Sequence, residues 1–513
     1  KDRKRGAVSA IMIIAGVSGG ILAASAAILW EQSIINEVYS FSTILILLSI
    51  YFLVRAINVS LSKEVDKNIL IKNSLPGFYF AGLALTNHLS STALLVPLVF
   101  ILYQLIISKS FNGRIMLLHV LVFIFPLTLY LYLPLRAINE PLMNWGNPVN
   151  FHNFWSHVTG WQYNVWMFNQ SPEQLISKLK DALNMLLAQF GYISFPLAIA
   201  GMVFLLRKNR RLFYMFLFMI LLNLVYTVNY DIPDIHSYYL PSIAVLGILA
   251  VTGIYYMLNM IDRGNLIGRA LLVLLICAGM GVNAYSGYPR LGVRFQRLAG
   301  ILNSDIMRSA QKDGFILTRN WDVYSPWLYN RYVKYIRPDL AMGDKELFRR
   351  SWYLDYLWDE HPEFRENIKE EFEKFREALY PFEHEMKYDS RLLSERFDKL
   401  INGVLETRSK LGPVYNTFFE DREITNRYNR IPEGLLFRLY QAEEAFLIPT
   451  PEFQFEREID RGSLTREQIM LQGNSYTAMM RNRIKYLRFV GEEPAATDLI
   501  KRERKISAAV IEK

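Results

Sequence analysis

Long apolar runs, separated by short polar stretches, occupy the first 286 residues of the chain. The runs lie at roughly 8–29, 38–57, 76–87, 90–107, 115–135, 190–206, 211–228, 239–258 and 268–285. A helix needs about 20 apolar residues to cross the hydrocarbon core. The pattern therefore predicts a membrane domain over residues 1–286 with nine crossings. The run at 76–87 is short, so we expect a half-helix or a re-entrant segment there.

Basic residues mark every second stretch between the runs, and the positive-inside rule assigns such stretches to the cytoplasm. They are Lys1 to Arg5, then Lys63, Lys67 and Lys72, then Lys109 and Arg114, then Arg207, Lys208, Arg210 and Arg211, then Arg263 and Arg269. Nine crossings put all of them on one side. We expect the opposite face to carry Glu31 to Glu37, the Asn87–His88 turn, 136–189, the Asp231–Tyr239 loop and the chain from Tyr288 onward.

The long stretch 136–189 ends in a predicted helix. Ser171 is a candidate N-cap, Pro172 takes the first helical position and Gln174 completes a capping box. Apolar residues then recur at three- and four-residue spacing from 175 to 187, with charged residues largely on the other side. This spacing predicts an amphipathic helix lying on the membrane surface.

The sequence changes character after the last apolar run. Short apolar stretches at 314–318 and 340–342 predict two strands around a helical stretch at 325–335, which indicates a small α/β unit over 287–345. Residues 346–513 are charged and predict a helical soluble region. The expected fold class is therefore mainly α, with a polytopic helical bundle followed by a non-cytoplasmic soluble domain.

Charge and cysteine content exclude several classes. The chain has 57 Lys and Arg against 48 Asp and Glu, and much of the basic excess lies between the apolar runs, so it indicates no nucleic-acid partner. A single cysteine, Cys277, excludes an internal disulfide and a cysteine-based metal cluster. The sequence has no phosphate-binding loop, dinucleotide fingerprint or nucleophile elbow. A metal site assembled across loops stays open, and the cofactor is unknown.

The stretch Tyr226 to Pro241 concentrates polar groups where one apolar run ends and the next begins. Asp231, Asp234 and His236 lie there among tyrosines, which favour a membrane–water interface. Acidic groups this close to hydrocarbon are costly and indicate a functional site. The alternative is that they are loop residues in water.

Arg136 is a lone cation at the end of an apolar run on the non-cytoplasmic side. It is either a snorkelling helix end or a clamp for an anion, since a guanidinium matches a phosphate bidentately. Four tryptophans follow, at positions 145, 155, 161 and 166, and we expect an interfacial belt more than a substrate platform.

Five stretches together resemble one family. They run from Trp30 to Ser42, Phe80 to Pro97, Leu133 to Tyr163, Tyr230 to Ser242 and Gly314 to Met342. They are similar to glycosyltransferase family 117, the bacterial multi-pass proteins of domain of unknown function 2723. The eukaryotic relative of that family is the transmembrane-protein-260 O-mannosyltransferase.

The resemblance implies a GT-C fold and an enzyme of the bacterial inner membrane, with its C-terminal region periplasmic. Such an enzyme transfers a sugar, here expected to be mannose, from a polyprenyl-phosphate donor to a protein or glycan acceptor on the non-cytoplasmic face. The family's catalytic acid is expected in the first external loop. The matching sequence begins at the segment feeding Trp30, so we expect that loop upstream of Lys1.

The implied mechanism is inverting transfer, with a carboxylate as general base and a cation at the departing lipid phosphate. Asp231 and Asp234 are the catalytic candidates. The substrate-binding candidates are Arg136 for the phosphate and His236, Tyr239, Asn87, His88 and Glu37 for the sugar or acceptor. Alternatively, Glu37 caps the next span and His88 satisfies a turn.

Two other function classes stay open. A transporter or lipid flippase commonly shows inverted repeats and charges near the bilayer midplane. This sequence shows no internal repeat, and its polar residues gather at one face, which favours the transferase. A polymer ligase of the same membrane architecture is the nearer alternative.

Overall fold

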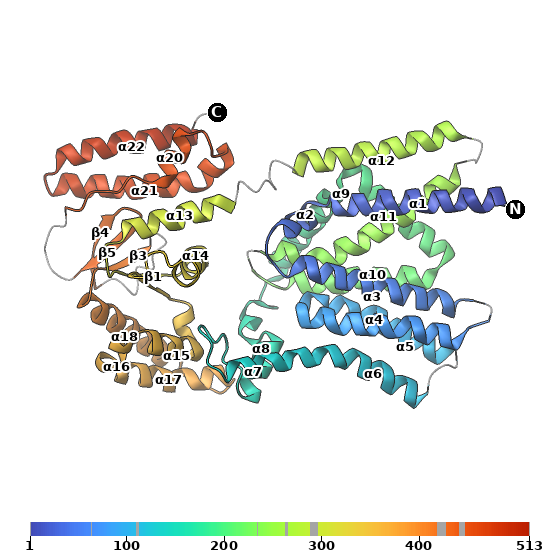
Figure 1. Cartoon of the computed structure of the whole chain (residues 1–513), viewed down its shortest axis with the longest axis horizontal. Helices are drawn as coiled ribbons and strands as arrows, with labels where there is room; N and C mark the ends of the chain where they lie inside the picture. Colours follow the sequence, from blue (N-terminus) through green and yellow to red (C-terminus); the bar gives the residue numbers. More distant parts are fainter. Residues whose placement is uncertain are drawn as a thin grey trace. The chain divides into compact units, whose positions relative to one another are not determined.

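The computed structural model describes residues 2–62, 64–108, 112–232, 234–261, 265–287, 296–417, 427–440 and 447–511. The chain forms two compact units: Lys1–Leu135 with Trp155–Gly292, and Arg136–Phe154 with Val293–Lys513 (Figure 1). The first is a helical bundle and the second holds a small mixed sheet, which confirms the predicted mainly helical fold class. Four predicted cytoplasmic residues, Lys1, Lys63, Lys109 and Arg263, lie outside the described residues.

Helices occupy most of the chain from residue 2 to residue 287, and the apolar ones follow the predicted runs. The helices are α1 (Asp2–Ala24), α2 (Ala27–Ile34), α3 (Tyr39–Ser60), α4 (Lys67–Asn87), η1 (Leu89–Leu94), α5 (Leu95–Ile107), α6 (Gly113–Leu127), η2 (Thr128–Leu131), α7 (Tyr132–Ala137), α8 (Phe151–Thr159), η3 (Trp161–Trp166), α9 (Pro172–Lys208), α10 (Arg210–Val228), η4 (Ile235–Tyr239), α11 (Leu240–Met260) and α12 (Leu266–Gly287). Within the described residues, six helices are long and apolar enough to cross a membrane, or up to eight if each bent pair is one span.

Helix α4 corrects the expectation of a short segment at 76–87. It has 21 residues, about 31 Å of helix, and it packs against α3 and α6. Asp66 caps it by accepting hydrogen bonds from the backbone N–H groups of Asn68 and Ile69. Its first half is polar, so the hydrophobic pattern revealed only the second half. The six to eight apolar helices do not include α4, so nine crossings stay a prediction.

Helix α9 confirms the predicted capping box and adds a bend. The Ser171 side chain accepts from the Gln174 backbone N–H, and the Gln174 side chain accepts from the Ser171 backbone N–H. At Gly191 the backbone takes φ 63°, and the halves Pro172–Gly191 and Phe195–Lys208 differ in direction by 100°. A left-handed conformation of this kind suits glycine, which has no Cβ.

The first half of α9 carries two apolar faces. Ala182 and Leu186 are buried in the bundle. A second stripe of Ile176, Leu179, Leu183 and Leu187 is exposed in the chain itself, each residue at least 41% exposed. The location of this helix on the membrane surface stays a prediction, and the exposed apolar stripe is the face that would meet lipid there.

The second unit is built on a five-stranded sheet of order β2-β1-β3-β5-β4. The strands are β1 (Phe315–Thr318), β2 (Ala341–Asp344), β3 (Val414–Thr417), β4 (Asn429–Glu433) and β5 (Leu436–Tyr440). Strand β1 pairs in parallel with β2 and β3, while β5 pairs antiparallel with β3 and β4. The predicted strand–helix–strand unit is confirmed. The sheet continues past residue 345, where the sequence predicted only helices.

Helices enclose this sheet on two sides (Figure 1). They are α13 (Gln296–Ser309), α14 (Trp321–Tyr332), η6 (Leu347–Arg349), α15 (Ser351–Glu360), α16 (Pro362–Asn367), α17 (Lys369–Glu383), α18 (Ser390–Ser409), α20 (Gln454–Asp460), α21 (Arg466–Phe489) and α22 (Glu493–Ile511). The sheet lies between the α21–α22 pair and the group α15 to α18.

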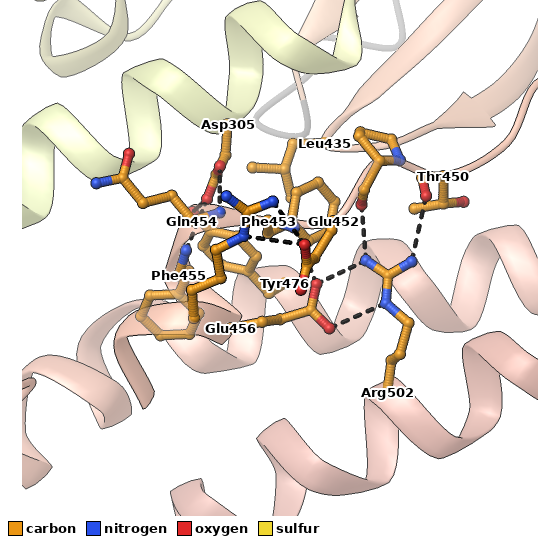
Figure 2. Close-up of polar contacts among 12 residues, drawn as sticks. Asp305, Leu435, Thr450, Glu452, Phe453, Gln454, Phe455, Glu456, Tyr476 and Arg502 are labelled. Atoms are coloured by element: carbon orange, nitrogen blue, oxygen red, sulfur yellow. Dashed lines mark hydrogen bonds and ion pairs between the residues drawn. The ribbon is translucent and has the colours of Figure 1, made fainter. Parts of the chain in front are cut away.

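A buried polar network attaches the C-terminal helices to α13 (Figure 2). The Asp305 carboxylate is 0% exposed and accepts hydrogen bonds from the backbone N–H of Phe455 at 3.0 Å and from the Tyr476 hydroxyl at 2.9 Å. Arg502 of α22 donates to both oxygens of Glu456, at 3.0 and 2.6 Å. Bidentate pairs of this kind are strong and directional, so this network fixes the last three helices.

Candidate functional site

The connection that leaves α10 and enters the Asp231–Tyr239 loop is held by backbone contacts to the last residue of η3 and the two residues after it. The Asp231 N–H donates to the Trp166 carbonyl at 3.0 Å, and the Phe168 N–H donates to the Asn229 carbonyl at 2.9 Å. An isolated antiparallel bridge joins Met167 to Tyr230. The long stretch after α7 therefore returns to the polar loop that the sequence singled out.

An ion pair joins the loop to α9. Lys178 Nζ lies 2.6 Å from Asp231 Oδ1, with side chains that are 29% and 67% exposed. A small cavity of about 170 Å³ opens beside this pair and is lined also by Asp181, His236 and Tyr239. Three predicted site residues, Asp231, His236 and Tyr239, are thus brought together with two that the sequence did not indicate as ligands.

Asn223 is a positioning residue that the sequence reading missed. Its side chain is 2% exposed inside α10, donates to the Tyr238 carbonyl at 3.0 Å and accepts from the Ser242 hydroxyl at 2.6 Å. Thr227 donates to the Asn223 backbone carbonyl at 2.8 Å. A lone amide within an apolar run was the available signal, because intramembrane polar groups usually bond to another helix.

An aromatic cluster joins three separate segments of the first unit. The His88 ring lies 4.9 Å from the Tyr39 ring and 4.9 Å from the Tyr238 ring, measured between centroids. Tyr238 also lies 5.4 Å from Tyr230 and 6.3 Å from Tyr226. The start of α3, the turn after α4 and the loop before α11 therefore meet at these rings.

A cavity of about 550 Å³ opens beside this cluster. Its lining includes the predicted residues Asn87 and His88, together with Tyr226, Tyr230 and Tyr238. None of its described lining residues carries a carboxylate, an ammonium or a guanidinium group. A largely apolar wall with a few hydroxyl, amide and imidazole groups is the usual composition of a small-molecule site.

The turn around His88 has both a structural and a cavity-facing role. Asn87 Nδ2 donates to the Val38 carbonyl at 3.0 Å, and the Ser90 backbone N–H donates to His88 Nδ1 at 3.2 Å. Burial lowers the pKa of His88 to about 4, although the negative charge of Asp234 opposes this shift. The neutral ring therefore carries its proton on Nε2, because Nδ1 accepts a hydrogen bond.

The other candidates lie near these cavities or in the second unit. Asp234 and Glu37 are exposed, and the Asp234 charge helps to raise the pKa of Tyr230, which burial raises most, to about 12. Arg136 is exposed and belongs to the second unit. The Asp231–His236 loop belongs to the first unit, so a shared cavity of this loop with Arg136 stays a prediction.

Trp145 is one of the four tryptophans expected in an interfacial belt, and that belt stays a prediction. It packs inside the second unit, with its ring 4.6 Å from Trp352 and 5.8 Å from Trp321. Its segment, Arg136–Phe154, belongs to that unit. The sequence placed this residue at the membrane because tryptophan near a span is typical of an interface.

Metal-ligating side chains do not gather in the part of the chain that the structure describes. No group of three or more His, Cys, Asp or Glu residues there is placed to hold a metal ion.

Comparison with known proteins agrees with the resemblance found in the sequence. Residues 1–111 match the family model described as Protein O-mannosyl-transferase TMEM260 N-terminal domain. The Protein O-mannosyl-transferase TMEM260 of Mus musculus is 26% identical over 361 residues, which cover 66% of this chain and 50% of the mouse protein. The chain thus spans about half the length of this relative. No solved structure matches the chain.

Proposed function

We propose that this protein is a multi-pass membrane glycosyltransferase of the GT-C type. It transfers mannose from a polyprenyl-phosphate carrier to a hydroxyl group of a protein or glycan acceptor. The reaction takes place on the non-cytoplasmic face, which is the periplasmic face of a bacterial inner membrane, and the C-terminal region lies on that side. The similarity to an O-mannosyltransferase supports the sugar and the reaction class.

One observation carries the assignment of the site. Four of the five stretches that resemble glycosyltransferase family 117 line the same 550 Å³ cavity, contributing Phe41, His88, His157 and Tyr238. These residues are far apart in the sequence and share this one surface. Its uncharged, aromatic wall suits a sugar better than a phosphate, and the neutral His88 ring can donate from Nε2 to a sugar oxygen.

The two loop carboxylates take different roles in the proposed reaction. Asp231 is paired with Lys178, so its carboxylate is engaged in holding the loop to α9. No ion pair of Asp234 occurs among the described residues, and its charge acts on His88 and Tyr230 beside the cavity. Asp234 therefore accepts the proton of the acceptor hydroxyl. Asp231 positions the loop.

The proposed reaction forms one bond to the anomeric carbon and breaks one. The acceptor oxygen forms a bond to the anomeric carbon of mannose while the bond from that carbon to the phosphate oxygen breaks. The electron pair of the broken bond leaves with the lipid phosphate. Arg136 stabilises that phosphate, as a bidentate guanidinium can. This proposal also includes the substrate-binding roles of Arg136, Asn87, His236, Tyr239 and Glu37.

The test is transfer of labelled mannose from polyprenyl-phosphate mannose by the full-length protein in liposomes. Asp234→Asn should lower the transfer rate by about 100-fold or more, the range that general-base catalysis supplies. Asp231→Asn should lower it less, and Glu31→Gln, an exposed control on the same predicted face, should leave it unchanged. Equal transfer by wild type and Asp234→Asn would refute the base assignment. Lipid translocation without transfer would indicate a flippase instead.

A further inference from the structure

The second unit contains a cavity of its own, of about 640 Å³. It lies between the segment Arg136–Phe154 and helix α15. Its volume falls in the range of about 300–1,000 Å³ that is typical of ligand sites. Its described lining includes none of the residues that we assign to the transfer reaction.

One wall of the cavity is aromatic and comes from α15. Trp352, Tyr356 and Trp358 line it, and the first two are only 6% and 8% exposed. Trp145 packs against Trp352 from the segment side, 4.6 Å between ring centroids. The rings are therefore fixed by packing before any ligand arrives, which reduces the entropy cost of binding.

The opposite wall is a loop held by its own hydrogen bonds. Asn144 Nδ2 donates to the Ala137 carbonyl at 3.2 Å and to Asn147 Oδ1 at 3.0 Å. Asn153 Nδ2 donates to the Asn147 carbonyl at 2.9 Å. Leu142 and Met143 add apolar surface between these amides. These hydrogen bonds hold the loop in one conformation, so it forms a defined wall of the cavity.

All charged groups among the described lining residues are carboxylates: Glu140, Asp355, Asp359 and Glu360. Three of them have an arginine partner that does not line the cavity, and Asp355, for example, lies 3.0 Å from Arg376. Burial raises the pKa of Asp355. Aromatic faces together with carboxylates attract cations. Asp359 and Glu360 lie against Arg365 and Arg331, so Glu140, which has no ion pair among the described residues, is the lining carboxylate left for a cation.

We infer that this cavity binds a basic segment of a polypeptide, with a Lys or Arg side chain set against Trp358 and Tyr356 and near Glu140. This inference rests on the proposed function, in which that polypeptide is the acceptor protein. The donor and the acceptor then bind in separate cavities. The sugar binds in the uncharged aromatic cavity, and the acceptor protein binds in the acidic aromatic cavity.

The experiment measures binding of fluorescein-labelled peptides to the full chain in detergent, by anisotropy. One peptide contains Lys and Thr, and a second has Gln in place of every Lys. The double variant E140Q/D359N removes two exposed carboxylates of the cavity without changing side-chain size. The control variant E377Q/D398N removes two exposed carboxylates elsewhere in the second unit, on α17 and α18.

The Lys peptide should bind more tightly than the Gln peptide, and the preference should weaken in high salt. E140Q/D359N should weaken binding of the Lys peptide about fivefold, the effect expected for two partly exposed charge pairs. The control variant should bind like the wild type. Equal binding of both peptides, or an equal loss in both variants, would overturn the inference. Preferred binding of a neutral oligosaccharide would do the same.

Mannose transfer is measured on the same preparations, so the two proposals can fail separately. Transfer with no charge preference in peptide binding would refute the acidic cavity and leave the proposed function standing. The predicted peptide preference without any transfer would support the cavity as a polypeptide site and count against the proposed function.

Discussion

The buried amide of Asn223 offers a direct test of how the candidate site is held. Asn223→Ala removes the donor to the Tyr238 carbonyl and the acceptor for the Ser242 hydroxyl, both inside the bundle. A buried polar group left unsatisfied costs about 1–3 kcal/mol. Hydrogen bonds between membrane helices average only about 0.6 kcal/mol, because the unfolded state also finds partners. The expected loss of unfolding free energy is therefore about 1–3 kcal/mol in total.

A double-mutant cycle with Ser242→Ala isolates the shared bond. The coupling free energy should be about 1 kcal/mol, measured by reversible denaturant unfolding in mixed micelles. The matched control is Asn229→Ala, because the hydrogen bond that the Asn229 side chain makes among the described residues is local, to the Val225 carbonyl in the last turn of α10. That variant should change stability by less than about 0.5 kcal/mol.

The functional readout separates a positioning role from a merely structural one. If Asn223 sets the Tyr238 turn beside the cavity, Asn223→Ala should raise KM for the lipid-linked donor in protein that is still folded, since the cavity wall is displaced. Asn223→Ala with normal KM, or a coupling free energy near zero, would refute the reasoning.

Three other predictions follow from the described residues. A tag placed in the loop after α9 should report the cytoplasm, and a tag near Asp234 should report the opposite side of the membrane. Cysteine or glycan accessibility measures the side, and finding both tags on one side would contradict the predicted topology. If the Leu183 stripe contacts lipid, Leu183→Asp should destabilise the protein in bilayers by about 1–3 kcal/mol more than the control Asn184→Asp. Equal effects of the two substitutions in thermal unfolding would count against this lipid contact. Burial raises the pKa of Asp344 to about 6, against hydrogen bonds from backbone N–H groups that lower it. The contribution of Asp344 to the free energy of unfolding should therefore be full below about pH 4 and be lost as the pH rises through 6. The difference in stability between wild type and Asp344→Asn should change by up to about 3 kcal/mol over this range, and a difference that does not change with pH would refute the prediction.

Local patterns predicted much of the fold. The apolar runs, the capping box at Ser171 and the strand–helix–strand unit around α14 all depend on residues close in sequence. The polar first half of α4 was missed because hydropathy reports lipid contact, and this helix is covered by α3 and α6. Strands β3 to β5 were missed because four- and five-residue strands carry little periodicity. Strand β3 also pairs with β1, which lies far upstream in the sequence.

The candidate site was predicted as a set of residue types rather than as an arrangement. Interfacial acids and tyrosines pointed to the Asp231–Tyr239 loop. The Lys178 pair joins residues 53 apart, and the Asn223 bonds reach Tyr238 and Ser242 across two helices. Contacts of that kind depend on how helices pack, which no local pattern encodes. Trp145 is the opposite case, since residue type suggested the membrane while packing placed it in the second unit.

The central claim is that the cavity lined by Phe41, His88, His157 and Tyr238 receives the mannose of the lipid-linked donor. The most direct measurement is photocrosslinking with polyprenyl-phosphate mannose that carries a diazirine on the sugar, followed by peptide mapping. Label is expected in the peptides that contain His88 and Tyr238, and it should be lost when unlabelled donor competes. Label that resists competition, or that maps only to residues 296–511, would contradict it.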